Sequence, residues 1–226
     1  MSGYPIVLTR CERAIVVGGG DVALRKVEGL LAGGAAVVVI SNEAIASLRA
    51  QAEEGRFSLI LRQFQPGDLA GAQLAVAATD DRNVNEMVYR EARKLGILVN
   101  VVDDPQRCTF HVPAVVQRGP VTVAVSTGGA SPHLAAYLRK RIAKAVGDEY
   151  GTLAEILGDW RAWILHNVPK ARRAALWDEL ITRMLPLLRA GNAEEATRVG
   201  AAIVSRAAGR PTPQDWLPPT EASCAS

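Results

Sequence analysis

The sequence predicts an α/β fold built on a parallel sheet, followed by a region made only of helices. Two observations lead to this fold class. In the first half, short continuous runs of Val, Ile, Leu and Ala alternate with helical patterns, which is typical of strands covered by helices on both faces. From Leu153 onward, apolar residues recur only at spacings of three and four, as in amphipathic helices. The 226 residues suffice for one large domain or two small ones.

The first part of the chain alternates expected strands with expected helices. Apolar runs predict buried strands at 14–17, 37–40, 59–61, 74–78 and 98–102. Helical patterns predict helices at about 22–31, from Asn42 to about 54, and 83–94. Residues 5–8 are a candidate edge strand, to which Pro5 contributes no backbone donor.

The pattern changes after Pro113. Residues 121–125 alternate apolar with small or polar residues, as a half-exposed strand does. A glycine loop follows, and then Ser131 and Pro132 predict the N-cap and first turn of a helix to about residue 146. We therefore expect four parts: an α/β domain, a small β-plus-helix segment, an all-helical domain and a flexible tail, at 1–112, 113–147, 148–207 and 208–226.

Composition and charge exclude several classes of protein. The chain is 49% hydrophobic and 22% charged, as an ordinary globular protein is, and no apolar run reaches the ~18 residues of a membrane helix. Cys11, Cys108 and Cys224 are odd in number and far apart, so neither a disulfide framework nor a zinc site is expected. We expect a cytoplasmic protein without membrane or nucleic-acid partners and without a preformed metal site. The net charge of +3 slightly favours an anionic ligand. Of the three cysteines, Cys108 is expected to be a small buried apolar residue.

The segment Gly-Gly-Gly-Asp-Val-Ala at 18–23 fits the pattern G-x-G-x-x-A between an expected strand and an expected helix. In this pattern Gly18 allows the tight turn, Gly20 lets the backbone approach a pyrophosphate, and Ala23 permits close packing of helix on strand. The helix N-terminus supplies amide donors to the phosphates. We therefore predict a Rossmann-like domain, against the alternative of a tight turn without a ligand. The expected cofactor contacts here are Gly18, Gly19, Gly20, Asp21 and Val22.

The ends of the second and fourth strands are expected to complete the cofactor site. Asn42 and Glu43 are candidates for the ribose, although Asn42 alternatively caps the next helix and Glu43 is alternatively a first-turn charge. No Arg or Lys stands there to meet a 2′-phosphate, so NAD is expected rather than NADP. Thr79 and Asp80 are expected near the nicotinamide ribose, or one of them caps the following helix; both roles are compatible.

Four motifs in a fixed order carry a more specific signal, at residues 17–23, 77–81, 100–103 and 125–132. Together they resemble the precorrin-2 dehydrogenase family, which comprises the N-terminal module of siroheme synthase and its stand-alone relatives, some of which also insert iron. The resemblance covers about residues 4–147, and the chain is similar to the stand-alone form because no methyltransferase module follows.

The resemblance implies NAD-dependent oxidation of precorrin-2 to sirohydrochlorin, for siroheme or a related tetrapyrrole, with ferrochelatase activity left open. It also implies a homodimer built largely by residues 113–147, so that this segment is a dimerisation segment. By the same resemblance, the active site lies in the cleft between the cofactor domain and this segment.

The family's key aspartate follows Asn-Val-Val and corresponds to Asp103, not to its neighbour Asp104. The reaction removes a hydride from carbon and a proton from elsewhere on the ring. The cofactor takes the hydride, so the protein supplies at most a base. Asp103, just past a strand, suits that base or a group that orients a ring NH. The alternative is a helix or turn cap ahead of Pro105.

Precorrin-2 carries eight carboxylates, which need cationic and amide partners. The candidate cations are Arg118, Arg139, Lys140, Arg141 and Lys144. We expect only one or two of them to bind, because a charge run on a helix is usually solvated. Thr127 stands where siroheme synthases often have serine, and His111 has the alternative of a structural histidine. The expected substrate contacts are Asn100, His111, Ser126, Thr127, Gly128, Gly129 and Arg139.

A second class of function also fits the glycine turn. Non-catalytic NAD-sensing modules, such as the regulatory domains of potassium transport systems, begin in the same way. They usually carry an acidic residue at the end of the second strand, which is not evident here. The β-plus-helix segment and helical region that follow the glycine-turn domain favour the enzyme over the sensor.

Overall fold

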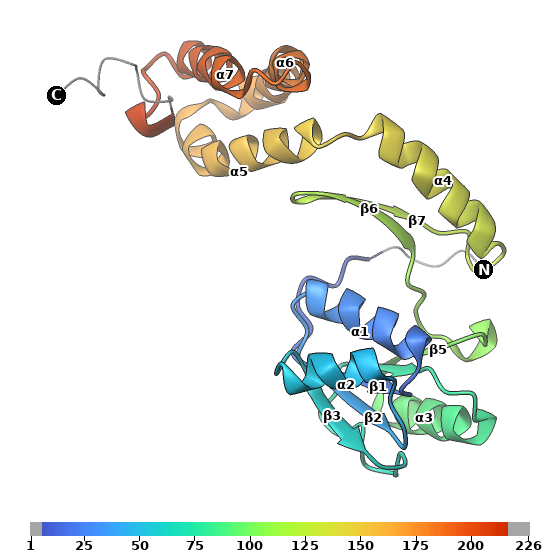
Figure 1. Cartoon of the computed structure of the whole chain (residues 1–226). Coiled ribbons are helices and arrows are strands. Elements are labelled where there is room, and N and C mark those ends of the chain that lie inside the picture. Colours follow the sequence, from blue (N-terminus) through green and yellow to red (C-terminus); the bar gives the residue numbers. More distant parts are fainter. Residues whose placement is uncertain (1–5, 217–226) are drawn as a thin grey trace. The chain divides into compact units, whose positions relative to one another are not determined.

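The computed structural model describes residues 6–216, which form two compact units (Figure 1). The first comprises the described residues up to Val112 together with Gly128–Ala130. The second comprises Pro113–Thr127 and the described residues from Ser131 onward. Each unit has its own hydrophobic core. None of the helices in residues 6–216 has the length and apolar character needed to cross a bilayer.

A five-stranded parallel sheet forms the centre of the first unit, with the strand order β3-β2-β1-β4-β5. The strands are β1 (Ala14–Val17), β2 (Val37–Ser41), β3 (Ser58–Leu61), β4 (Leu74–Ala77) and β5 (Leu98–Val101). The order reverses between β1 and β4, and doubly wound sheets bind ligands beyond the carboxyl ends of the strands at such a switch point. The predicted α/β class with a parallel sheet is confirmed.

Helices cover both faces of this sheet (Figure 1). Val16 of β1 packs in a core with residues of α1 and α2, whereas its neighbour Val17 packs in a core with residues of α3. Side chains of a strand alternate between faces, so two buried faces require the continuous apolar runs seen in the sequence. The helices are α1 (Asp21–Ala32), α2 (Ala46–Glu53) and α3 (Arg82–Leu95).

The second unit begins with an antiparallel hairpin of β6 (Ala114–Arg118) and β7 (Val121–Val125). Helix α4 (Pro132–Ala145) follows, and Ser131 caps it as predicted, because the Leu134 amide donates to the Ser131 hydroxyl oxygen at 3.2 Å. The β-plus-helix segment and the helical region predicted after it are both present.

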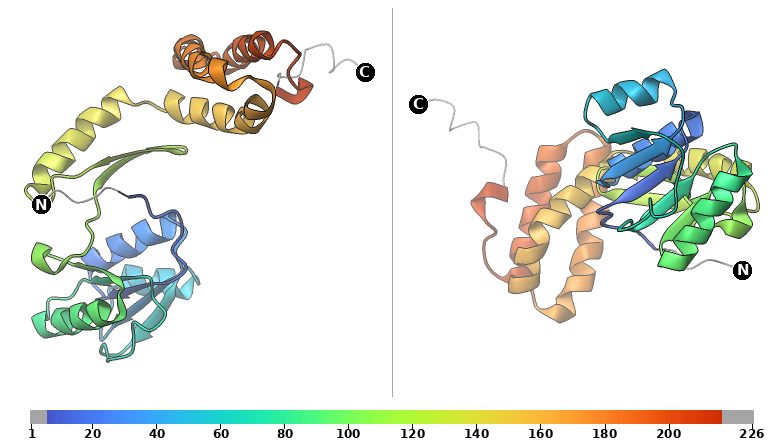
Figure 2. Two further views of the ribbon diagram at one scale, coloured as in Figure 1. Left: turned by 180° about the vertical axis from the view of Figure 1, so that it is seen from behind. Right: turned by 90° about the horizontal axis from the view of Figure 1, so that it is seen from below.

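Three further helices form the core of the helical region (Figure 2). They are α5 (Glu149–Asn167), α6 (Lys170–Arg189) and α7 (Ala193–Ala208). Trp160 of α5 and Met184 of α6 are buried against α7 at Gly200, where a Cβ would crowd both side chains. Trp216, in a short 3-10 helix at Gln214–Trp216, stacks on Trp160 with ring centroids 4.6 Å apart. The rest of the expected tail, residues 217–226, lies outside the described residues.

Two local expectations are wrong. Helix α2 begins at Ala46 rather than at Asn42, because the Ile45 amide donates to the Gly19 carbonyl oxygen at 2.9 Å and holds Ile45 in an extended conformation. Residues 6–8 form no strand in the described chain, and the Val7 side chain is 75% exposed. Pro5, the other residue of that expected strand, lies outside the described residues.

Candidate functional site

The glycine turn joins β1 to α1 and is enclosed by the ends of two neighbouring strands. Gly18 has a φ of +130°, and a Cβ there would overlap the carbonyl oxygen of Ala78, which follows β4. A Cβ on Gly19 would overlap the carbonyl oxygen of Glu43, which follows β2. Gly20 is open, since no heavy atom lies within 4 Å of the place where its Cβ would be. Gly18 and Gly19 therefore allow neighbouring backbone segments to pack against the turn, and Gly20 leaves its own backbone accessible to a ligand.

The N-terminus of α1 has no side-chain cap. Gly20 is the N-cap residue, and no side chain accepts a hydrogen bond from the first-turn amides. These amides have no partner within the helix, so they are available to an anion. Ala23 is completely buried where α1 packs on the sheet, which agrees with the small residue that the motif requires. This end of α1 has the geometry of a phosphate-binding site.

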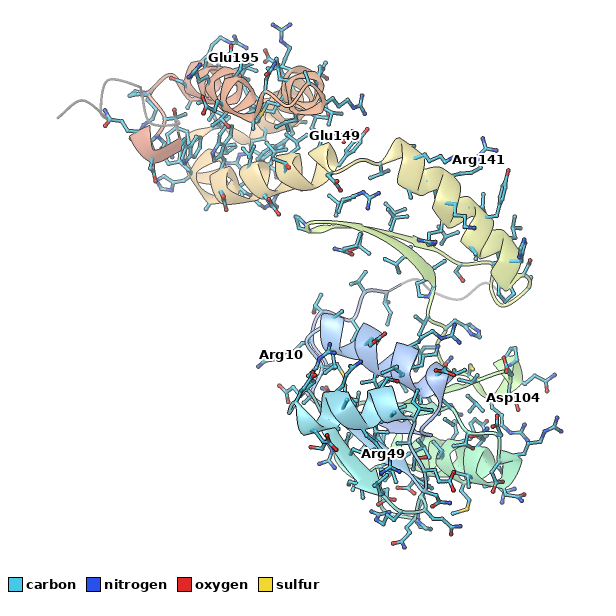
Figure 3. The ribbon with its side chains drawn as sticks, viewed as in Figure 1. Arg10, Arg49, Asp104, Arg141, Glu149 and Glu195 are labelled. Atoms are coloured by element: carbon cyan, nitrogen blue, oxygen red, sulfur yellow. The ribbon has the colours of Figure 1, made fainter. Side chains whose placement is uncertain are left out.

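The loop after β2 carries Asn42 and Glu43 beside the glycine turn. Both side chains are exposed. The N-cap of α2 is Ile45, so the alternatives that Asn42 caps this helix or that Glu43 is a first-turn charge are wrong. The sequence analysis missed Arg49 (Figure 3), whose Nε donates to the Ala44 carbonyl oxygen at 2.9 Å and braces the loop. This contact between α2 and the loop after β2 exists only in the folded chain, so no sequence pattern indicates it.

The segment after β4 is organised by Asp81. Its carboxylate accepts hydrogen bonds from the amides of Asn83 at 2.8 Å and Val84 at 3.4 Å, so Asp81 caps α3. The alternative that Thr79 or Asp80 provides this cap is therefore wrong. The Thr79 hydroxyl accepts from the Asp81 amide at 3.1 Å, whereas Asp80 is exposed.

Asp103 follows β5 and has an unusual backbone conformation. Its φ is +59°, and among residues 6–216 it alone has a positive φ without being glycine. Aspartate is one of the few residue types that enter this left-handed region, and such outliers are concentrated at functional sites. The side chain is exposed, and the hydrogen bonds and ion pairs of the described chain leave its carboxylate unpartnered.

The neighbouring Asp104 has the role of turn cap (Figure 3). Its carboxylate accepts from the Arg107 amide at 3.3 Å and forms an ion pair with the Arg107 guanidinium. The hydrogen bond from Arg107 lowers the pKa of Asp104 below its ordinary value. Arg107 also pairs with Glu86 of α3 at 2.6 Å. The cap expected as an alternative for Asp103 is therefore made by Asp104, which leaves Asp103 available.

Asn100 lies in the interior of the first unit rather than on an open surface. It is 7% exposed, and its side-chain amide donates to the Phe110 carbonyl oxygen at 3.1 Å. This amide thus ties β5 to the segment that returns past it. Cys108, expected to be an apolar core residue, is half-buried, and its sulfur accepts a hydrogen bond from the Val101 amide at 3.3 Å.

The expected substrate residues outside the sheet lie on loops and on α4. Thr127 closes the loop before α4, because its hydroxyl accepts from the Ser131 amide at 3.1 Å. His111, Ser126, Gly128 and Gly129 are exposed, and Arg139 is half-buried on α4.

Arg118 binds the end of α4 instead of standing free for a ligand. Its guanidinium donates to the carbonyl oxygens of Val146 at 3.0 Å and Ala143 at 3.2 Å, and it lies 3.2 Å from the Asp148 carboxylate. Because these contacts occupy its guanidinium, they do not favour the expectation that Arg118 binds a substrate carboxylate.

The structure brings the expected cofactor residues together at one edge of the sheet. Val17, Ile40 and Ala77 are aligned in register, and Ala77 is aligned with Val101 on β5. The glycine turn, Glu43 and Thr79 follow three of these strand ends, and Asp103 follows the fourth. Within residues 6–216, no three His, Cys, Asp or Glu side chains gather where they would hold a metal ion.

Comparisons with known proteins agree with this geometry. Residues 7–114 match a family described as "Putative NAD(P)-binding", and residues 118–145 match one described as "Sirohaem biosynthesis protein central". The siroheme synthase of Methylococcus capsulatus is 44% identical over 202 residues, which cover 88% of this chain and 43% of that protein. Siroheme synthase 1 of Pectobacterium atrosepticum is 40% identical over 201 residues, which cover 87% of this chain and 42% of that protein.

A solved structure titled "SirC, precorrin-2 dehydrogenase" is also similar, with a TM-score of 0.70 and 27% identity over 87% of this chain and 98% of that chain. The chain belongs to the siroheme synthase N-terminal module family. It spans about two-fifths of the length of the curated siroheme synthases that it matches. The NAD(P)-binding match of this family spans all five strands of the parallel sheet, so the sheet and its glycine turn form a dinucleotide-binding domain.

Proposed function

We propose that the protein is an NAD-dependent precorrin-2 dehydrogenase, which oxidises precorrin-2 to sirohydrochlorin for siroheme or a related tetrapyrrole. One observation carries the proposal: an unpartnered Asp103 in left-handed conformation follows the same edge of the sheet as the glycine turn. The likeness to a precorrin-2 dehydrogenase over 98% of its chain supports the same reaction. The net change is precorrin-2 and NAD⁺ to sirohydrochlorin, NADH and a proton.

The residues at the glycine turn fit a dinucleotide. Gly20 is open, and the uncapped amides of α1 face the same space, so they would hold the pyrophosphate. Glu43, exposed beside the turn, would accept hydrogen bonds from the adenosine ribose and repel a 2′-phosphate, which favours NAD over NADP. When bound, NAD supplies the hydride acceptor. Thr79 and Asp80, after β4, would border the nicotinamide ribose.

Asp103 is the proposed base of the reaction. A carboxylate that accepts no hydrogen bond from the described chain is free to accept one from a ring NH of the substrate. It would take up the proton that the ring loses as the hydride leaves carbon. The left-handed conformation costs on the order of 1 kcal/mol for a residue other than glycine.

The substrate carboxylates need donors, and α4 and the loop before it supply candidates. Arg139 on α4 is half-buried, and the described chain gives its guanidinium no ion pair. The exposed residues Ser126, Gly128 and Gly129 would donate hydrogen bonds from the loop before α4. His111 would face the ring, whereas Thr127 and Asn100 would act by holding their segments in place.

The same segment supports a homodimer. Leu134, Tyr137 and Leu138 follow one another at helical spacing on α4 and are 46%, 51% and 37% exposed. Val115 of β6 is 39% exposed. Exposed large apolar side chains of this kind are typical of an interface, and we propose that a second copy covers them. The proposed location is the cytoplasm, which suits a biosynthetic enzyme with two free thiols in its described residues.

An anaerobic turnover assay tests the proposed function. Purified protein is mixed with enzymatically generated precorrin-2 and NAD⁺, and absorbance follows sirohydrochlorin and NADH. Both are expected to form at matching rates, and Fe²⁺ added afterwards tests chelation by the same protein. Binding of NAD without formation of either product would contradict the proposal and favour a non-catalytic NAD-sensing module.

A further inference from the structure

The loop that carries Asp103 leaves β5 and returns beside it. The return is fixed at Thr109, whose amide donates to the Val99 carbonyl oxygen at 2.8 Å. The Val99 amide donates in turn to the Thr109 hydroxyl oxygen at 2.8 Å. The residues between these bonds and the end of β5 form a closed loop, and Asp103 is the residue in it with positive φ.

The thiol of Cys108 lies inside this loop and contacts both sides of Asp103. On the strand side, its sulfur accepts from the Val101 amide at 3.3 Å and lies 3.2 Å from the Val101 carbonyl oxygen. On the other side, it lies 3.3 Å from the carbonyl oxygen of Asp104. Asn100 adds a fourth contact, from its side-chain amide at 3.4 Å. One side chain thus connects Val101 and Asp104, the first and last residues of the turn that contains the proposed base.

The protonation state of Cys108 suits this arrangement. Burial raises the pKa of the Cys108 thiol above its ordinary value. The thiol therefore keeps its proton at neutral pH, and an S–H group donates to a carbonyl oxygen while the sulfur accepts from an amide. A thiolate would lose the donor and would repel both carbonyl oxygens.

We propose that Cys108 is a positioning residue for Asp103, because its thiol links Val101 to Asp104, supports the turn closed by the hydrogen bond from the Asp104 amide to the Val101 carbonyl oxygen, and so holds Asp103 within that turn in the left-handed conformation. The inference rests on the function proposed above for Asp103. A strained backbone persists only where surrounding contacts determine it. Within the described loop, the thiol is the side chain that contacts backbone on both sides of Asp103.

The first test compares Cys108→Ala, which removes every thiol contact, with Cys108→Ser, which keeps a donor and an acceptor. Cys11→Ala is the matched control, because Cys11 is the other thiol of the described chain and lies in the core of the sheet. Cys108→Ala should lower kcat about tenfold to a hundredfold with little change in the KM for NAD⁺. Cys108→Ser should restore most of kcat, and Cys11→Ala should leave it unchanged.

Three outcomes would overturn the inference: a kcat for Cys108→Ala within twofold of the unmodified protein, an equal loss in Cys108→Ser, or an equal loss in Cys11→Ala.

A second test does not need activity. Glycine adopts positive φ without strain. In an Asp103→Gly background, residue 103 therefore needs less support from the thiol to stay in the left-handed conformation. Cys108→Ala should therefore lower Tm by less in that background than in the unmodified protein, in a double-mutant cycle. Equal losses of Tm in both backgrounds would contradict the inference. If the unmodified protein shows no turnover, the proposed function fails while this cycle still decides the role of Cys108.

Discussion

Gly19 and Glu43 pack backbone against backbone, with no room for a Cβ on the glycine. Two residues later, the Ile45 amide donates to the Gly19 carbonyl oxygen at 2.9 Å. The turn that approaches the pyrophosphate and the loop that carries the proposed ribose ligand are therefore joined. A change in one displaces the other, so both halves of the cofactor site depend on a glycine that the sequence pattern leaves unspecified.

Gly19→Ala should impair the cofactor site, whereas Gly20→Ala should leave the fold intact. The added methyl group at Gly19 would overlap the Glu43 carbonyl oxygen, which we expect to cost about 1–3 kcal/mol and to weaken NAD binding. At Gly20 the methyl group meets no atom within 4 Å, and the φ of −93° suits any residue. Thermal unfolding and calorimetry check this, and equal effects of the two variants on Tm would contradict it.

Gly20→Asp should weaken NAD binding at least tenfold without lowering Tm, because a carboxylate at the helix N-terminus competes with and repels the pyrophosphate. Gly29→Asp is the matched control, since it adds the same charge on an exposed position of α1 away from the turn. Calorimetric titration with NAD⁺ measures both. An unchanged affinity in Gly20→Asp would refute the assignment of the glycine turn.

Acid should destabilise the first unit partly through Asp68. Its carboxylate accepts two hydrogen bonds from the Arg62 guanidinium, each 2.7 Å long, and these lower the pKa of Asp68. A pKa lowered by folding adds stability above the pKa of the unfolded chain, about 4 for aspartate, and this stability is lost as the pH falls through the folded value. Asp68→Asn should therefore lose less stability than the unmodified protein between about pH 5 and pH 2. Glu53→Gln, at an exposed carboxylate, is the control, and parallel acid curves for Asp68→Asn and the unmodified protein would contradict the prediction.

Leu134→Asp should convert the proposed dimer into monomers. The leucine is 46% exposed on α4, and a charge there would be buried without a partner in the interface. Ile181→Asp is the control, because Ile181 is similarly exposed at 42% but lies on α6. Light scattering after size-exclusion chromatography measures the mass. A monomeric unmodified protein, or the same mass for both variants, would contradict the proposed interface.

The sequence predicted the sheet well because its signals are local. Each buried strand is a run of apolar residues, and Gly18–Gly20 mark the turn between strand and helix. The late start of α2 was missed because it depends on Gly19 and Ile45, which are distant in sequence and meet only in the fold. Local patterns do not contain such a contact.

Polar details of the site were predicted less well, for a related reason. Thr79, Asp80 and Asp81 are all able to cap a helix, and the position at which α3 starts selects Asp81. Cys108 was expected to be apolar because its polar partners are backbone groups, which no sequence pattern reveals. The sequence identified Asp103 only through the family resemblance, whereas its left-handed φ distinguishes it from Asp104 on structural grounds.

The most direct measurement compares Asp103→Asn with Asp104→Asn in the anaerobic assay with precorrin-2 and NAD⁺. Asparagine keeps the shape of aspartate and tolerates the left-handed backbone, so only the carboxylate is removed. Asp103→Asn should lower NADH formation by about a hundredfold or more while NAD binding is retained. Asp104→Asn should lose the ion pair with Arg107 but keep most of the turnover. Turnover near that of the unmodified protein in Asp103→Asn, or its abolition in Asp104→Asn alone, would contradict the proposed mechanism.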